Sequence, residues 1–194
     1  MIDRCILKIG GSLLARRDSP ERIASLLAGE FSGQQVNLLI GGGKVIDALR
    51  ELDAAHSLCP VEMHWRCVRA LRLTFEIGGE WFPRVTRITT AEDFQSHRSC
   101  QTPGIYLIAA DAFYTPSDGD ALPRDWSTTS DSIAAYLATK LSIGRLVLIK
   151  SCAVAKGLTI EQAVQSGVVD ASLPAAGRGL RIELRTLDGQ RQVL

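Results

Sequence analysis

The sequence has little of what marks a membrane or nucleic-acid-binding protein. Its 194 residues carry 22 basic and 21 acidic side chains, so the net charge is only +1 and no broad basic surface is expected for nucleic acid or anionic lipid. The apolar runs are short, well below the roughly 20 residues that cross a bilayer. We therefore expect no nucleic-acid partner and no membrane span, and any charged ligand must be bound locally.

Cysteine is also scarce, and its spacing is irregular. The five cysteines form no C-x-x-C pair: Cys5, Cys59, Cys67, Cys100 and Cys152. Neither a disulfide framework nor a zinc site is indicated. The first residues include Asp3 and Arg4 and lack the pattern of a signal peptide. We expect reduced thiols in a cytoplasmic protein.

Short apolar runs alternate with helical patterns along the chain, whose length and 46% hydrophobic content fit a single domain over residues 1–194. This alternation predicts an α/β fold, with a mostly parallel sheet covered by helices on both faces in a three-layer α/β/α sandwich. Residues 180–194 alternate around a tight turn and predict a C-terminal β-hairpin. Strands are predicted over 5–9, 36–40, 105–109 and 146–149, and helices over 20–30, 44–55, 59–75 and 130–141.

Two glycine turns follow the first two predicted strands: Gly10-Gly11-Ser12 and Gly41-Gly42-Gly43. Glycine lets backbone N–H groups converge on an anion, and a following helix adds a favourable field. Neither turn is a P-loop or a G-x-G-x-x-G fingerprint, and either alone is also explained as a tight connection. At the ends of neighbouring parallel strands, however, both would face one crevice, so together they predict a phosphate site.

Three charged residues are candidates for chemistry near these turns. Lys8 lies among apolar neighbours and either neutralises a transferring phosphoryl group or reaches solvent from an edge strand. Asp131 lies in the first turn of a predicted helix, where it is either a simple N-terminal acid or the group that orients catalytic lysines. Lys150 and Ser151 end a strand, where they are candidate phosphate or nucleotide contacts.

A basic stripe runs along the predicted helix over 59–75. Arg66, Arg69 and Arg72 recur at helical spacing beside His64. The stripe is either a contact for an anionic acceptor or an ordinary solvated face.

Three motifs together resemble the amino-acid-kinase superfamily, in the family's order. They are Lys8-Ile9-Gly10-Gly11-Ser12, Gly41-Gly42-Gly43 and Thr129-Ser130-Asp131-Ser132-Ile133-Ala134. That superfamily includes acetylglutamate, carbamate, uridylate and isopentenyl phosphate kinases. Within it, the chain looks most like the aminomethylfuran phosphate kinases of methanofuran-type one-carbon cofactor synthesis. This closer likeness rests on His64-Trp65, on residues 126–134 and on Val169-Asp170 with Leu173-Pro174.

The resemblance implies an ATP- and Mg²⁺-dependent kinase with a small phosphate-bearing acceptor. It also implies a homo-oligomer, because relatives are often dimers or larger. No side chain is assigned to the metal. The implied catalytic residues are Lys8 and Asp131, and the implied phosphate or nucleotide contacts are Gly10, Gly11, Ser12, Lys150 and Ser151. The implied acceptor contacts are Gly41, Gly42, Gly43, His64, Arg66, Thr129 and Ser130.

The chain departs from the family after the strand over 146–149. The family usually has an Asp-x-Asp-Gly-like nucleotide loop there, whereas this chain has Lys150-Ser151-Cys152-Ala153-Val154. Lys150 and Lys156 are the two candidates for the second lysine that many relatives use. Two alternatives stay open: a non-catalytic relative acting as a partner or regulatory subunit, and a kinase of an amino acid or an isoprenoid phosphate.

Overall fold

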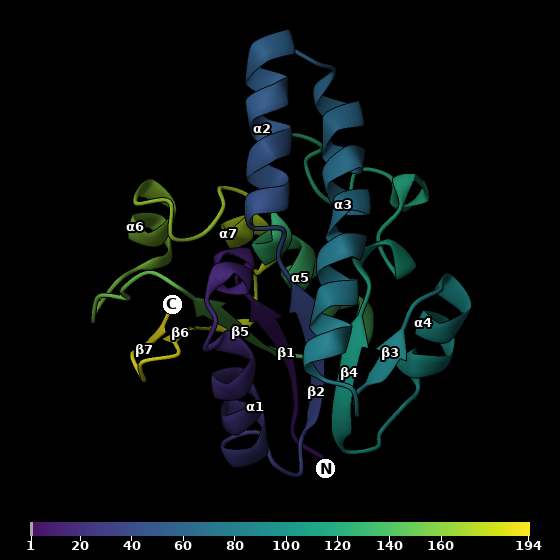
Figure 1. The fold of residues 1–194 in the computed structure, drawn as a ribbon, viewed down its shortest axis with the longest axis vertical. Coiled ribbons are helices and arrows are strands. Elements are labelled where there is room, and N and C mark those ends of the chain that lie inside the picture. The colour runs from purple at the N-terminus through teal and green to yellow at the C-terminus, as the bar shows by residue number, and fades with distance from the viewer. Residues whose placement is uncertain (1) are drawn as a thin grey trace.

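The computed structural model describes residues 2–194, which build one continuous seven-stranded sheet. The strand order is β3-β4-β2-β1-β5-β6-β7, and every neighbouring pair is parallel except the antiparallel β6 and β7 (Figure 1). The predicted mostly parallel sheet and C-terminal hairpin are confirmed. The strands are β1 (Arg4–Ile9), β2 (Gln35–Ile40), β3 (Thr86–Ile88), β4 (Gly104–Ile108), β5 (Arg145–Lys150), β6 (Arg181–Thr186) and β7 (Arg191–Val193).

Helices cover both faces of this sheet. The helices α1 and α3 lie on one face of the sheet and α5 lies on the other (Figure 1). The helix α3 packs on β2 and β4, and α5 packs on β1 and β5. Every residue of β2 is buried, as a strand covered on both faces requires. The α-helices are α1 (Ser19–Gly29), α2 (Lys44–His56), α3 (Pro60–Trp81), α4 (Ala91–Arg98), α5 (Ser130–Leu141), α6 (Ile160–Gln165) and α7 (Leu173–Ala176), and the short 3₁₀ helices are η1 (Gly11–Ala15), η2 (Ala110–Ala112) and η3 (Pro116–Asp118).

The helices α2 and α3 project beyond the carboxyl ends of the central strands (Figure 1). No residue of α2 is fully buried, so this helix forms a wall above the sheet rather than part of the core. Within residues 2–194, no helix combines the length and the apolar character needed to cross a membrane.

The helix α3 is longer than predicted, because it ends at Trp81 rather than Phe75. Two buried glycines lie in the extension. A Cβ atom on Gly78 would come within 1.9 Å of Ile40 Cδ1, and one on Gly79 within 2.7 Å of Arg87 Cζ. The glycines therefore allow close packing on the sheet instead of ending the helix, and this packing outweighs their low helix propensity.

Candidate active site

The two glycine turns meet backbone to backbone at the carboxyl ends of β1 and β2. A Cβ atom on Gly11 would lie 2.0 Å from the Gly43 nitrogen, and one on Gly43 would lie 2.2 Å from the Gly11 oxygen. Gly43 also has a φ of +52°, in the region that favours glycine. No side chain fits between the turns, so the predicted common crevice is bounded by backbone atoms where the two turns meet.

Two lysine ammonium groups converge on one buried carboxylate beside these turns. Lys8 Nζ lies 2.9 Å from Asp131 Oδ1, without hydrogen-bond alignment, and Lys150 Nζ donates to Asp131 Oδ2 at 2.5 Å. Lys8 and Lys150 come from adjacent strands, and all three side chains are at most a tenth exposed. With both lysines protonated, this centre has one positive charge in excess, which is an environment that suits a phosphate group.

The ionisation of this centre follows from burial and from the lysines. Burial acts to raise the pKa of Asp131, but the charges of Lys8 and Lys150 outweigh it and hold the pKa to about 2. Burial lowers the pKa of Lys150, and the nearby Lys8 charge adds to this effect while Asp131 opposes it. Asp131 is therefore an ionised group that holds cations, rather than a proton donor or acceptor at neutral pH.

Asp170 fixes the helix that carries Asp131. Its carboxylate accepts hydrogen bonds from the Thr129 backbone N–H and hydroxyl, both at 2.8 Å, and from the Ser132 N–H at 3.0 Å and the Ser132 hydroxyl. These contacts satisfy backbone donors in the first turn of α5, where a negative charge is also favoured by the helix dipole. Asp131 therefore enters the site from a helix end that is anchored by a residue 39 positions later in the chain.

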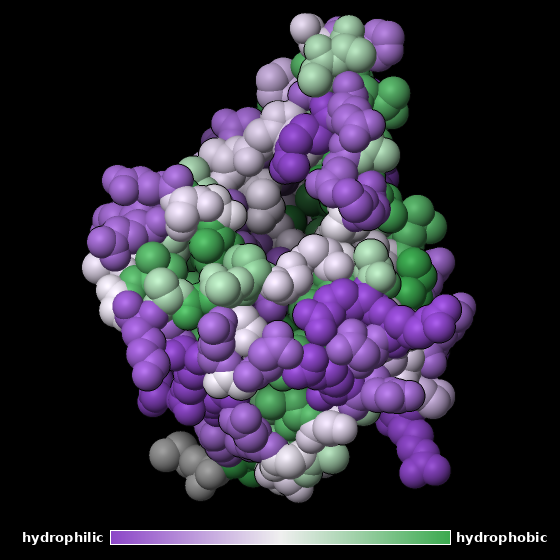
Figure 2. Space-filling model, turned by 60° about the vertical axis from the view of Figure 1, so that its left-hand side comes forward, coloured by the Kyte–Doolittle hydropathy of each residue, from purple (hydrophilic) through white to green (hydrophobic). Residues whose placement is uncertain are grey.

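A cavity of about 480 Å³ lies above the glycine turns, between α2, α3 and the N-terminus of α5. The surface is hollowed at the base of the projecting helices (Figure 2). Ten of the predicted residues line it: Lys8, Gly11, Ser12, Gly42, Gly43, His64, Thr129, Ser130, Asp131 and Lys150. The structure thus brings residues from five separate segments of the chain together around one space.

Four predicted residues lie outside the cavity lining. The N–H groups of Gly10 and Gly41 donate to Ile149 O and Ile9 O, at 2.8 and 2.9 Å, so they extend the sheet and are not free to bind phosphate. Ser151 is exposed and its hydroxyl lies 2.6 Å from that of Ser12, which links the ends of β5 and β1. Arg66 is exposed on α3 and points to solvent.

The rest of the basic stripe is also placed away from the cavity. Arg69 is exposed, and Arg72 forms an ion pair with Asp111 at 2.6 Å and donates to Thr89 O at 2.8 Å. His64 is different, because it is buried at the cavity wall with its Nε2 atom 2.9 Å from the Tyr114 hydroxyl. Burial lowers the pKa of His64, so the ring is neutral at physiological pH.

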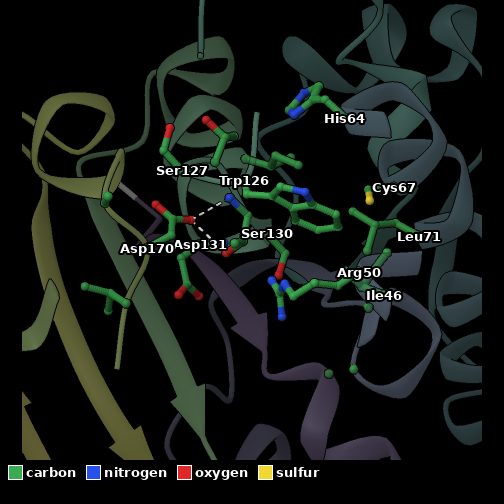
Figure 3. Close-up of a pocket in the computed structure, with 18 of the residues that line it drawn as sticks. Ile46, Arg50, His64, Cys67, Leu71, Trp126, Ser127, Ser130, Asp131 and Asp170 are labelled. Atoms are coloured by element: carbon green, nitrogen blue, oxygen red, sulfur yellow. Dashed lines mark hydrogen bonds between the residues drawn. The ribbon is translucent and has the colours of Figure 1, made fainter. Parts of the chain in front are cut away.

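Two residues of the cavity, Arg50 and Trp126, were not predicted as site residues. Arg50 comes from α2 and Trp126 from the segment before α5, and both line the cavity (Figure 3). The Arg50 guanidinium carbon lies 4.7 Å from the centroid of the Trp126 ring. Trp126 Nε1 in turn donates to Asp53 Oδ2 at 2.6 Å. Arg50 lies on the same side of α2 as Ile46, one turn earlier, and this spacing is the one signal that could have found it.

Comparison with known proteins supports the fold, although no protein-family model and no protein of curated function matches the sequence. A UMP kinase from Ureaplasma parvum matches with a TM-score of 0.67 and 14% identity, over 100% of this chain and 99% of that chain. A UMP kinase from Bacillus anthracis matches with a TM-score of 0.67 and 16% identity, over 96% and 88%. An aspartate kinase from Synechocystis matches with a TM-score of 0.66 and 14% identity, over 97% of this chain and 40% of that chain.

The protein therefore has an amino-acid-kinase-like fold, as the sequence motifs predicted. At identities of 14–16%, the likeness concerns the fold alone. The closer resemblance to aminomethylfuran phosphate kinases stays a prediction.

Proposed function

We propose that the protein is an ATP-dependent kinase that phosphorylates a small phosphate-bearing acceptor, with an aminomethylfuran phosphate as the best single candidate. The observation that carries this proposal is the pair of buried ammonium groups, Lys8 and Lys150, held on Asp131 beside two side-chain-free glycine turns. Phosphoryl transfer needs positioning and charge stabilisation more than covalent chemistry, and this centre supplies both.

In the proposed reaction, an oxygen of the acceptor phosphate forms a bond to the γ-phosphorus of ATP while the bond from that phosphorus to the bridging oxygen breaks, which releases ADP. Lys8 and Lys150 stabilise the charge on the transferring group, and Asp131 holds both ammonium groups in position. The free amides of the turns bind phosphate oxygens. An anionic acceptor oxygen has no proton to lose, so no general base is required.

The lysines suit the phosphates of ATP by their charge. The glycine turns suit them because a Cβ atom at Gly11 or Gly43 would collide with the backbone of the other turn, so only backbone is presented there. Within residues 2–194, no group of three or more His, Cys, Asp or Glu side chains is arranged to hold a metal. The proposal therefore has Mg²⁺ carried on the ATP oxygens, where it would neutralise phosphate charge.

A phosphate acceptor is favoured by the structural neighbours that are UMP kinases, because UMP is itself a phosphomonoester. A kinase of an amino acid or an isoprenoid phosphate is the alternative of the same class. The non-catalytic alternative rests on the loop over 151–159, which has no acidic residue. A single domain, a homo-oligomer and a cytoplasmic location stay predictions.

The test uses the two lysine variants Lys8→Ala and Lys150→Ala, with Lys156→Ala as the control. Lys156 is exposed and does not line the cavity. Mg-AMPPNP binding is measured by calorimetry, and ADP release is measured with furfuryl phosphate as acceptor. Removing either buried lysine should lower turnover by about 10²-fold or more, as loss of one group that stabilises transition-state charge does.

Three results would count against the proposal. If the wild-type protein does not bind Mg-AMPPNP, the non-catalytic alternative replaces it. If Lys150→Ala keeps turnover within a few-fold of wild type, Lys150 is not the second lysine. If Lys156→Ala lowers turnover as much as Lys150→Ala, the assignment of the two lysines is wrong.

A further inference from the structure

We infer that Arg50 binds the phosphate of the acceptor and that Trp126 holds Arg50 in place to do so, which makes the acceptor a phosphomonoester with a small apolar or aromatic body. This inference rests on the proposed function, and it adds the residues that recognise the second substrate.

Arg50 is the one basic group of the cavity that no carboxylate holds closely. Among the described residues that line the cavity, three carry an ammonium or guanidinium group, and Lys8 and Lys150 are both held by Asp131. Within residues 2–194, the only acid that forms an ion pair with Arg50 is Asp47, whose Oδ1 atom lies 3.6 Å away in an exposed pair within one helix. Such pairs are weak, so the planar donors of the guanidinium remain available to an incoming phosphate.

Trp126 restricts where Arg50 can reach. The guanidinium lies against the indole ring, and the ring is fixed by the hydrogen bond from Nε1 to Asp53, three residues after Arg50 on the same helix. The helix α2 therefore contacts Trp126 through two side chains, one on the ring face and one at its edge. A cationic side chain held on an aromatic face keeps its charge but has fewer conformations. It therefore loses less conformational entropy on binding an anion than a freely moving side chain does.

The direction of Arg50 connects it to the lysine centre. Figure 3 shows Arg50 reaching beneath the Trp126 ring toward Ser130. Ser130 lies next to Lys8, because a Cβ atom on Gly41 would meet both Ser130 Oγ at 2.7 Å and Lys8 Cε at 3.0 Å. A phosphate held by Arg50 is therefore on the side of the cavity where Lys8 would meet the transferring group.

The apolar side chains of the cavity determine the rest of the acceptor. Ile46, Val68 and Leu71 line it from α2 and α3, beside the neutral His64 and the Cys67 thiol, whose pKa burial raises to about 11. These groups offer an apolar surface to the body of the ligand. A cavity that binds a phosphate through Arg50 and an apolar body through these side chains fits a phosphomonoester of a small ring or branched alcohol better than it fits an amino acid.

The first experiment measures binding of furfuryl phosphate, furfuryl alcohol and Mg-AMPPNP by calorimetry to wild type, Arg50→Gln and Arg98→Gln. Arg98 is the matched control, because it is an exposed arginine on α4 outside the cavity. Arg50→Gln should weaken furfuryl phosphate by about tenfold or more, as loss of charged hydrogen bonds does, and leave Mg-AMPPNP binding unchanged. Arg98→Gln should change neither.

The second experiment tests the positioning role of Trp126. Trp126→Leu should weaken furfuryl phosphate in the wild-type background but have little further effect in the Arg50→Gln background, and Trp126→Phe should restore part of the loss. A purely structural role for the ring would instead give additive losses.

The outcomes separate this inference from the proposed function. The inference is overturned if Arg50→Gln binds furfuryl phosphate as tightly as wild type, or if wild type binds furfuryl alcohol equally well. It is also overturned if Arg50→Gln weakens Mg-AMPPNP to the same extent, because Arg50 would then contact the nucleotide. Failure of wild type to bind Mg-AMPPNP would refute the proposed function alone.

Discussion

Replacing Asp131 by asparagine removes the only charge that the two buried ammonium groups share. The fall of the Asp131 pKa from 3.8 to about 2 corresponds to about 2 kcal/mol in favour of the ionised carboxylate, after the opposing cost of burial. The substitution also leaves Lys8 and Lys150 facing each other, and breaking a buried ion pair costs about 3–5 kcal/mol. We expect Asp131→Asn to lower the free energy of unfolding by about 3–5 kcal/mol at neutral pH.

The difference in free energy of unfolding between Asp131→Asn and wild type should become smaller as the pH rises. Burial already lowers the pKa of Lys150 from 10.5, and the pKa falls further once Asp131 no longer opposes that effect. Between the folded and unfolded pKa values, the unfolded chain binds more protons than the folded one, so stability increases with pH in this window. The deficit of the variant should therefore become smaller as the pH rises from neutral toward 10.5, the ordinary pKa of a lysine.

Urea unfolding followed by circular dichroism at several pH values measures both effects. Asp120→Asn is the control, because its side chain is fully exposed and forms only a surface ion pair with Arg124 at 3.3 Å. The control should follow wild type at every pH. The electrostatic account of the site is refuted if Asp131→Asn unfolds with the wild-type free energy at neutral pH, or if its deficit is the same at every pH.

Two further predictions concern the glycine contact and a buried histidine. Gly11→Ala should lower the free energy of unfolding by about 3 kcal/mol or more through overpacking. Gly29→Ala is the control, because the space around its Cβ position is open, and it should be neutral or slightly stabilising. Equal urea midpoints for the two variants would contradict this prediction. Burial lowers the pKa of His97 below its ordinary value of 6.5, so the unfolded chain binds more protons below that pH and the protein should lose stability as the solution is acidified. His97→Gln should make the acid loss in thermal unfolding shallower, and an unchanged slope would show that another group is responsible.

The fold was largely predictable because its signals are local. The strands β1, β2 and β5 are short and mostly apolar, and each is buried on both faces, so their sequence pattern and their place in the sheet agree. The edge strand β3 has only three residues, two of them exposed, and it left no comparable pattern. The helix α4 does carry a capping box, formed by Thr90 and Asp93, which could have been used to predict it.

The site was predictable mainly where its residues lie at the end of a strand, directly follow one or begin a helix. Lys8, Gly11 and Asp131 occupy such positions. The contact between Lys150 and Asp131 depends on β5 lying next to β1, which nothing in the local sequence specifies. Arg50 is on a helix with no buried residue, where a charged side chain looks the same whether it faces solvent or a cavity.

The anchoring of α5 by Asp170 has a consequence for how the site is assembled during synthesis. The lysines and the acid that holds them are made before Asp170, but two backbone donors at the start of α5, the N–H groups of Thr129 and Ser132, are satisfied only once that later carboxylate arrives. A growing chain that has passed residue 150 but has not yet reached residue 170 therefore contains every charged group of the centre without the cap that orients the acid. The candidate site is therefore completed by the part of the chain that follows β5, although that part lines the cavity only through residues 167–171.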